Sequence, residues 1–180
     1  VPPSSRAWLA YGQAEQFATT DPARAEALYH EALTLANTVD NRFIEGVTLT
    51  SLAALQCRVG SPAAALVTFR AAIEHWLDAA DHTHQITTLR NLAVLFRALE
   101  LPIETARLLG GLNARQVATY GSERADLENI DRWLAEHLSS DELADARADA
   151  ACVGQALHWF DRPRYFDECA RVLRPGGVLV

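Results

Sequence analysis

The sequence predicts a mainly α-helical protein, in which antiparallel helical hairpins stack into an α-solenoid over residues 1–150 and a short β-α-β appendage follows. Prolines recur forty residues apart, and each opens a run with helical periodicity. Residues of similar size follow each proline at matching offsets. A repeat of this length is typical of stacked hairpins, because one hairpin cannot bury its apolar face alone. The prolines are Pro22, Pro62 and Pro102, and the matching sets are Ala25, Ala65 and Thr105; Tyr29, Phe69 and Leu109; and Ala32, Ala72 and Leu112.

The first hairpin is predicted over residues 6–39, with its first helix over residues 6–19. Asp21 is the expected N-cap of its second helix, because a carboxylate can accept a hydrogen bond from a free backbone N–H of the first turn. Pro22 lies in that first turn, where its missing N–H costs nothing.

The second and third hairpins are predicted over residues 43–80 and 84–119. Gly60 is expected to close the first helix of the second hairpin, because glycine adopts positive φ without strain. Pro62 opens the next helix. Gly110-Gly111 weakens the last helix of the third hairpin, since each glycine costs about 1 kcal/mol relative to alanine.

Two closing helices are predicted over residues 123–151. The string Ser139-Ser140-Asp141-Glu142 resembles a helix start, with carboxylates near the positive end of the helix dipole. Beyond residue 151 the pattern predicts a strand, a helix over residues 163–173 and a final strand after Gly176-Gly177. We therefore predict a helical domain over residues 1–150 and a separate β-α-β fragment over residues 152–180.

The small-aromatic-small pattern resembles the tetratricopeptide repeat, and it is clearest in Ala65, Phe69 and Ala72. Long repeats of this kind, closed by a helical pair, resemble a region of bacterial LuxR/AfsR-type transcriptional regulators, which are signal-transduction ATPases found in actinobacteria among others. The resemblance implies a cytoplasmic, non-enzymatic module that binds a protein or peptide in transcription regulation. It implies no direct contact with nucleic acid.

The tail resembles another family. Gln155-Ala-Leu-His-Trp-Phe-Asp161, followed by Arg171-Val-Leu-Arg-Pro-Gly-Gly177, is similar to a late β-α-β unit of class I S-adenosylmethionine-dependent methyltransferases. In that family the pair His158-Trp159 shapes the region near the cofactor pocket. The sequence lacks the Gly-x-Gly-x-Gly loop that cradles the cofactor. We therefore expect no cofactor and no enzymatic activity. One alternative is a truncated methyltransferase-related protein without a cofactor site, and another is a product with no selected function.

Net charge, hydropathy and cysteine content limit the classes of protein to which this chain can belong. The net charge of −7 argues against a general nucleic-acid binder, and no run of apolar residues is long enough to span a membrane. Three scattered cysteines are typical of a reducing cytoplasm. Asp81, His82 and His84 are interpreted as a solvated turn, because two histidines two residues apart do not share a helical face for a metal.

The groove lined by the first helix of each hairpin is the expected partner site. Arg90 and Arg97 are seven residues apart and share a helical face, so they could bind an acidic segment; alternatively they are solvated or paired with nearby acids. For the tail, open sheet edges leave three alternatives: packing on the last helices, homodimer formation through the tail, or poor order. The predicted groove residues are Phe17, Thr50, Cys57, Arg90 and Arg97.

Overall fold

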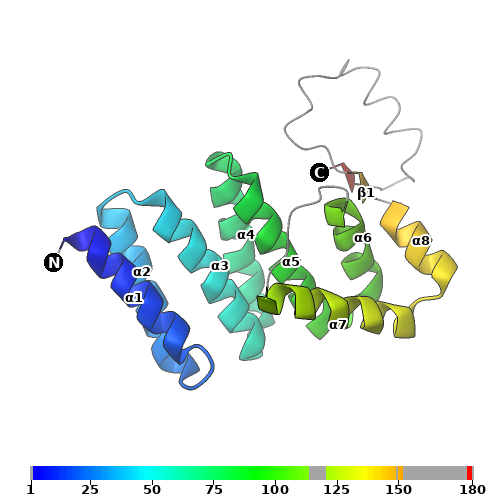
Figure 1. Cartoon of the computed structure of the whole chain (residues 1–180), viewed down its shortest axis with the longest axis horizontal. Helices are drawn as coiled ribbons and strands as arrows, with labels where there is room; N and C mark the ends of the chain where they lie inside the picture. The colour runs from blue at the N-terminus through cyan, green and yellow to red at the C-terminus, as the bar shows by residue number, and fades with distance from the viewer. Residues whose placement is uncertain (1, 114–120, 149, 152–177, 180) are drawn as a thin grey trace, which may run out of the picture. The chain divides into compact units, whose positions relative to one another are not determined.

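The protein is mainly α-helical, as predicted. A computed structural model describes residues 2–113, 121–148, 150–151 and 178–179. These residues form eight helices, packed as sequential antiparallel pairs, and two very short strands (Figure 1). The helices are α1 (Pro3–Phe17), α2 (Pro22–Thr38), α3 (Arg42–Arg58), α4 (Pro62–Asp78), α5 (His82–Ala98), α6 (Pro102–Asn113), α7 (Gly121–His137) and α8 (Ser140–Ala148), and the strands are β1 (Ala150–Ala151) and β2 (Val178–Leu179).

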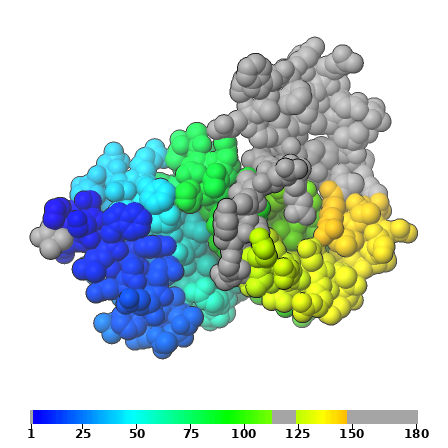
Figure 2. Space-filling model, viewed as in Figure 1, coloured from blue at the N-terminus to red at the C-terminus, as the bar shows by residue number. Residues whose placement is uncertain are grey.

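The chain divides into two compact units, unit 1 over residues 1–95 and unit 2 over residues 96–180. In unit 1, α1 packs against α2, α2 against α3 and α3 against α4. Figure 2 shows α1, in blue, at the viewed surface of this unit. In unit 2, α6 packs against α8, α7 contacts both of them, and β1 pairs with β2 in parallel.

The repeated small and aromatic positions form the core of the helical hairpins. Tyr29 and Phe69 are each 1% exposed, and the small residues one turn away on either side of them are fully buried. The equivalent residues of α6, namely Thr105, Leu109 and Leu112, are buried as well. Small side chains at these positions let antiparallel helices approach closely, and the larger one fills the space between them.

Side chains begin several of these helices as expected. The Asp21 carboxylate accepts a hydrogen bond from the Arg24 backbone N–H at 3.1 Å. Before α8, the Ser139 hydroxyl accepts from the Glu142 N–H, and the Glu142 carboxylate accepts from the Ser139 N–H at 2.9 Å. This reciprocal capping box confirms the predicted helix start at residues 139–142.

The turns between helices repeat every twenty residues, which is half of the predicted period. Asp40, Gly60, Ala80 and Glu100 all have positive φ, between 50° and 76°. After each of them, the backbone N–H of the next residue donates to a carbonyl of the preceding helix, five residues earlier, at 2.9–3.0 Å. This pairing is the Schellman motif, in which a left-handed residue ends the helix. Gly60 is therefore a helix terminator, as predicted.

Exchanging residues at these turns should change stability in opposite directions. A left-handed conformation costs a residue with a Cβ about 1–2 kcal/mol. Glycine avoids this cost, but it loses more conformational entropy on folding, which cancels part of its advantage. We expect Ala80→Gly to raise the free energy of unfolding by about 0.5–1 kcal/mol and Gly60→Ala to lower it by a similar amount. Urea unfolding followed by far-ultraviolet circular dichroism measures both. Equal shifts of the same sign would contradict this interpretation of the turns.

The tail is described at few positions. Most of the predicted strand-helix-strand segment, residues 152–180, lies outside the described residues, so the domain boundary near residue 150 stays a prediction. The third hairpin was predicted to reach residue 119; α6 is described to Asn113, and residues 114–120 are outside the described part. In the described residues, no helix is both long enough and apolar enough to cross a membrane.

Candidate functional site

Unit 1 contains a pocket of about 200 Å³ that opens between the first helices of the hairpins. Tyr11 of α1, Ser51 of α3 and Asn91 of α5 lie forty residues apart, so the repeat places them on one surface. The remaining lining residues are Val47, Thr50, Trp76, His84 and Thr87.

Trp76 of α4 forms a buried wall of the pocket. The residue is only 2% exposed, and its indole Nε1 donates to the Thr50 hydroxyl at 3.2 Å. The Thr50 and Thr88 hydroxyl oxygens lie 2.9 Å apart, which joins α3 to α5. A buried indole N–H needs such a partner, because an unpaired donor would be costly there.

His84 stacks on the face of Trp76. The ring centroids are 4.7 Å apart with 25° between the ring planes. The His84 Nδ1 lies 2.7 Å from an oxygen of Asp81, and the other Asp81 oxygen accepts from the His84 backbone N–H. Burial alone raises the pKa of Asp81, but these contacts with His84 outweigh it, so the pKa is lowered. The turn at residues 81–84 is therefore a structured helix cap that orients one histidine ring toward the pocket.

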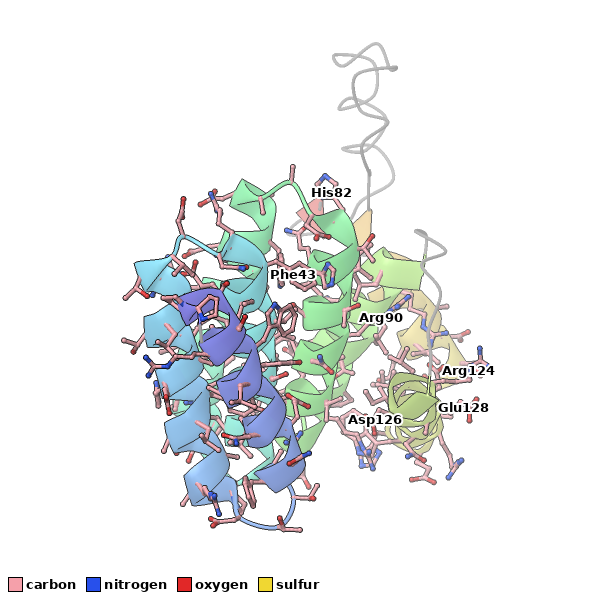
Figure 3. The ribbon with its side chains drawn as sticks, turned by 60° about the vertical axis from the view of Figure 1, so that its left-hand side comes forward. Phe43, His82, Arg90, Arg124, Asp126 and Glu128 are labelled. Atoms are coloured by element: carbon pink, nitrogen blue, oxygen red, sulfur yellow. The ribbon has the colours of Figure 1, made fainter. Side chains whose placement is uncertain are left out.

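Two exposed aromatic side chains form a rim beside the pocket. Trp8 is 44% exposed and Phe43 is 45% exposed. Their ring centroids are 6.0 Å apart, Trp8 is also 5.8 Å from Tyr11, and Phe43 is 5.2 Å from His84. Figure 3 shows Phe43 at the start of α3 and His82 in the first turn of α5. The rim therefore extends the aromatic surface of the pocket from Tyr11 to His84.

Tyr11 and Tyr29 lie near the carboxylate of Glu15. The Tyr29 hydroxyl donates to the Glu15 carboxylate at 2.6 Å, and the Tyr11 hydroxyl lies 3.5 Å from the Ser51 hydroxyl. Burial and the Glu15 charge raise the pKa of both phenols. Both phenol hydroxyls therefore stay protonated at neutral pH, and Tyr11 presents a neutral hydroxyl to the pocket.

The predicted groove residues take different places, and only Thr50 lines the pocket. Phe17 packs against the core of the first hairpin, and the Arg24 guanidinium lies 3.8 Å from its ring centroid. Cys57 is half-buried, and burial raises the pKa of its thiol, so it is a protonated side chain of low reactivity.

Neither of the two predicted arginines lines the pocket. Arg90 is only 7% exposed and interacts with other groups of the chain. Arg97 is exposed and belongs to unit 2. Sequence reasoning missed most of the pocket, although the forty-residue register of Tyr11, Ser51 and Asn91 was a usable signal.

Within residues 2–113, 121–148, 150–151 and 178–179, no group of three or more His, Cys, Asp or Glu side chains is arranged to hold a metal ion. Arg124, Asp126 and Glu128 of α7 are exposed (Figure 3).

Comparisons with known proteins point to unit 2. Residues 111–180 match the family described as "Methyltransferase domain". Uncharacterized methyltransferases of Mycobacterium tuberculosis and Mycobacterium bovis are each 57% identical to this chain over 37 residues, which are 21% of this chain and 15% of each relative. A malonyl-[acyl-carrier protein] O-methyltransferase of Hahella chejuensis is 41% identical over 49 residues, 27% of this chain and 18% of that protein. The chain thus matches less than a fifth of the length of these relatives. The search of solved structures gave no significant match.

These matches overturn one prediction. We expected no enzyme, because the chain lacks the glycine-rich loop, yet the matched domain and relatives are methyltransferases. The prediction gave too much weight to one missing loop and too little to the tail strings. The tetratricopeptide and regulator resemblances gain no support from these matches.

The described residues do not form the cradle for S-adenosylmethionine that the family resembled by the tail uses. The sequence has no Gly-x-Gly-x-Gly. In the described part of unit 2, α6, α7 and α8 all precede β1, so no described strand leads into a helix whose N-terminus could face the cofactor. Residues 111–180 thus match the methyltransferase domain family without this glycine-rich loop.

Proposed function

We propose that this protein takes part in S-adenosylmethionine-dependent methyl transfer and that residues 111–180 contribute part of a methyltransferase domain. The observation that carries the proposal is the family match over these residues. The parallel pairing of β1 with β2 supports it, because parallel strands require a crossover connection of the kind found in a β-α-β unit.

Calorimetric titration of the full-length natural protein with S-adenosylmethionine tests this function. We expect binding in the micromolar range. We also expect His158→Ala to weaken binding by about tenfold, or about 1.4 kcal/mol, because the resemblance places this residue near the cofactor pocket. Gly12→Ala, a change in unit 1, should leave the affinity unchanged. A full-length protein that gives no binding heat would contradict the proposal.

A second function is favoured for unit 1. We propose that its hairpins form a tetratricopeptide-like array that holds a partner or substrate protein for the methyltransferase. The pocket and its aromatic rim are the specific observation behind this idea, because aromatic side chains are enriched in protein interfaces.

A further inference from the structure

We propose that the pocket of unit 1 binds a positively charged protein segment that inserts one neutral aromatic side chain. This segment belongs to the partner proposed above for unit 1, on which the proposal rests, and its binding can be tested independently of methyl transfer.

The size and the lining of the pocket limit the inserted group. A volume of about 200 Å³ is smaller than the roughly 300–1,000 Å³ of pockets that enclose drug-sized ligands, so it suits a single ring-sized group. No Asp, Glu, Lys or Arg lines it. A charged side chain would lose its hydration there without an ionic partner, whereas a neutral ring would not.

Two lining residues offer hydrogen bonds that the chain leaves unused. Thr87 and Asn91 are one turn apart on α5, and neither side chain forms a hydrogen bond within the described part of the protein. Together they supply an amide, which both donates and accepts, and a hydroxyl. An inserted ring with a polar edge, such as tyrosine or tryptophan, can satisfy them.

A single inserted ring is too small to cover the exposed aromatic rim as well as fill the pocket. Trp8 and Phe43 leave nearly half of their surfaces exposed beside the pocket. Exposed aromatic residues next to a pocket are typical of binding surfaces, where Trp and Tyr anchors supply much of the affinity. A polypeptide segment can fill the pocket and cover the rim at the same time.

Charge determines which segment fits. A carboxylate lies close to the pocket on two sides. The Glu15 carboxylate accepts from the Tyr29 hydroxyl, and the Tyr29 ring lies 6.3 Å from the ring of Tyr11; on the other side, the Asp81 carboxylate holds His84. Acidic residues also outnumber arginines in unit 1, which contains no lysine. Basic residues on either side of the inserted ring would lie near these carboxylates, which raises the association rate and favours this orientation.

Blocked tripeptides test the proposal on the full chain. We expect Lys-Trp-Lys to bind at least about tenfold more tightly than Lys-Gly-Lys or Glu-Trp-Glu, as measured by calorimetry and by amide shifts in ¹⁵N NMR spectra. Lys-Gly-Lys controls for general attraction to an acidic protein. If Lys-Gly-Lys binds as tightly as Lys-Trp-Lys, the pocket does not recognise the ring, and if Glu-Trp-Glu does, the charge argument fails.

Two variants assign the binding to the pocket. Asn91→Ala removes the unused amide and should weaken Lys-Trp-Lys binding by about fivefold to tenfold. Val47→Trp should fill the cavity and abolish binding. Val67→Ser is the control, because Val67 is 71% exposed on α4 and does not line the pocket. Unchanged affinity in Asn91→Ala would overturn the proposed role of this residue, whether or not Val47→Trp folds. Amide shifts centred on Val67, away from the pocket, would place the peptide elsewhere.

Discussion

Trp76→Ala is expected to lower the free energy of unfolding of unit 1 by about 3–5 kcal/mol. The residue is 2% exposed, donates to Thr50 and lies against the rings of Phe43 and His84. Truncating a buried aromatic residue loses its transfer free energy and leaves a cavity, and costs of this size are typical. Since whole domains are stable by only about 5–15 kcal/mol, this one change should bring unit 1 close to unfolding.

Gly46 explains how Trp76 is accommodated. A Cβ at Gly46 would overlap the Trp76 ring carbons, so the glycine allows α3 and α4 to approach closely. Glycine inside a helix normally costs about 1 kcal/mol relative to alanine. We expect Gly46→Ala to destabilise unit 1 by about 1–3 kcal/mol, because overpacking outweighs the gain in helix propensity.

A matched variant and a double mutant separate these effects. Gly12 also lies inside a helix, but a Cβ there meets nothing within 4 Å, so Gly12→Ala should stabilise unit 1 by up to about 1 kcal/mol. In the Trp76→Ala background the overlap with the indole is gone and His75 Cδ2, at 2.8 Å, still lies close to the added Cβ, so Gly46→Ala should destabilise unit 1 much less than it does in the wild type. Urea unfolding of the four members of the cycle measures the coupling. Additive effects would show that Gly46 and Trp76 do not interact as the structure describes.

The repeat explains why so much of the helical part could be predicted from the sequence. Pro22, Pro62 and Pro102 begin α2, α4 and α6 as expected, and the small and aromatic residues that follow them are buried. These features are local, since a first-turn proline and a helical period act through the chain's own backbone. The twenty-residue spacing of the turns was harder to predict, because only Gly60 among the four left-handed residues is a glycine.

The pocket could be predicted only in part, because its register depends on tertiary packing. The groove prediction used Phe17, Cys57 and Arg97, which are forty residues apart, but the pocket uses the parallel set Tyr11, Ser51 and Asn91. Adjacent positions such as 90 and 91 differ by about 100° around a helix, so one step takes a side chain from the core to the pocket. Trp76 lies on α4, which is the second helix of its hairpin. The groove hypothesis considered only the first helix of each hairpin.

Gly110→Ala should disrupt unit 2 as strongly as Gly46→Ala disrupts unit 1. An added Cβ would lie 2.7 Å from the Arg147 Cα and 2.8 Å from its carbonyl oxygen. These are backbone atoms of α8, which cannot move aside as a flexible side chain can. We therefore expect α8 to shift away from α6, at a cost of about 2–3 kcal/mol, and to lose the 2.8 Å contact between Arg147 and Asp131.

Hydrogen exchange measured on peptides from the whole chain tests this prediction. Amides of α6 and α8 should exchange faster in Gly110→Ala, whereas amides of α1 to α4 should keep their wild-type rates, because local opening is confined to the destabilised unit. Gly12→Ala is the matched control, because it changes unit 1 and should leave the exchange rates of α6 and α8 at their wild-type values. Unchanged exchange of α8 in Gly110→Ala would contradict the close approach of the two helices. Slower exchange would show that the added Cβ is accommodated between α6 and α8 and stabilises them.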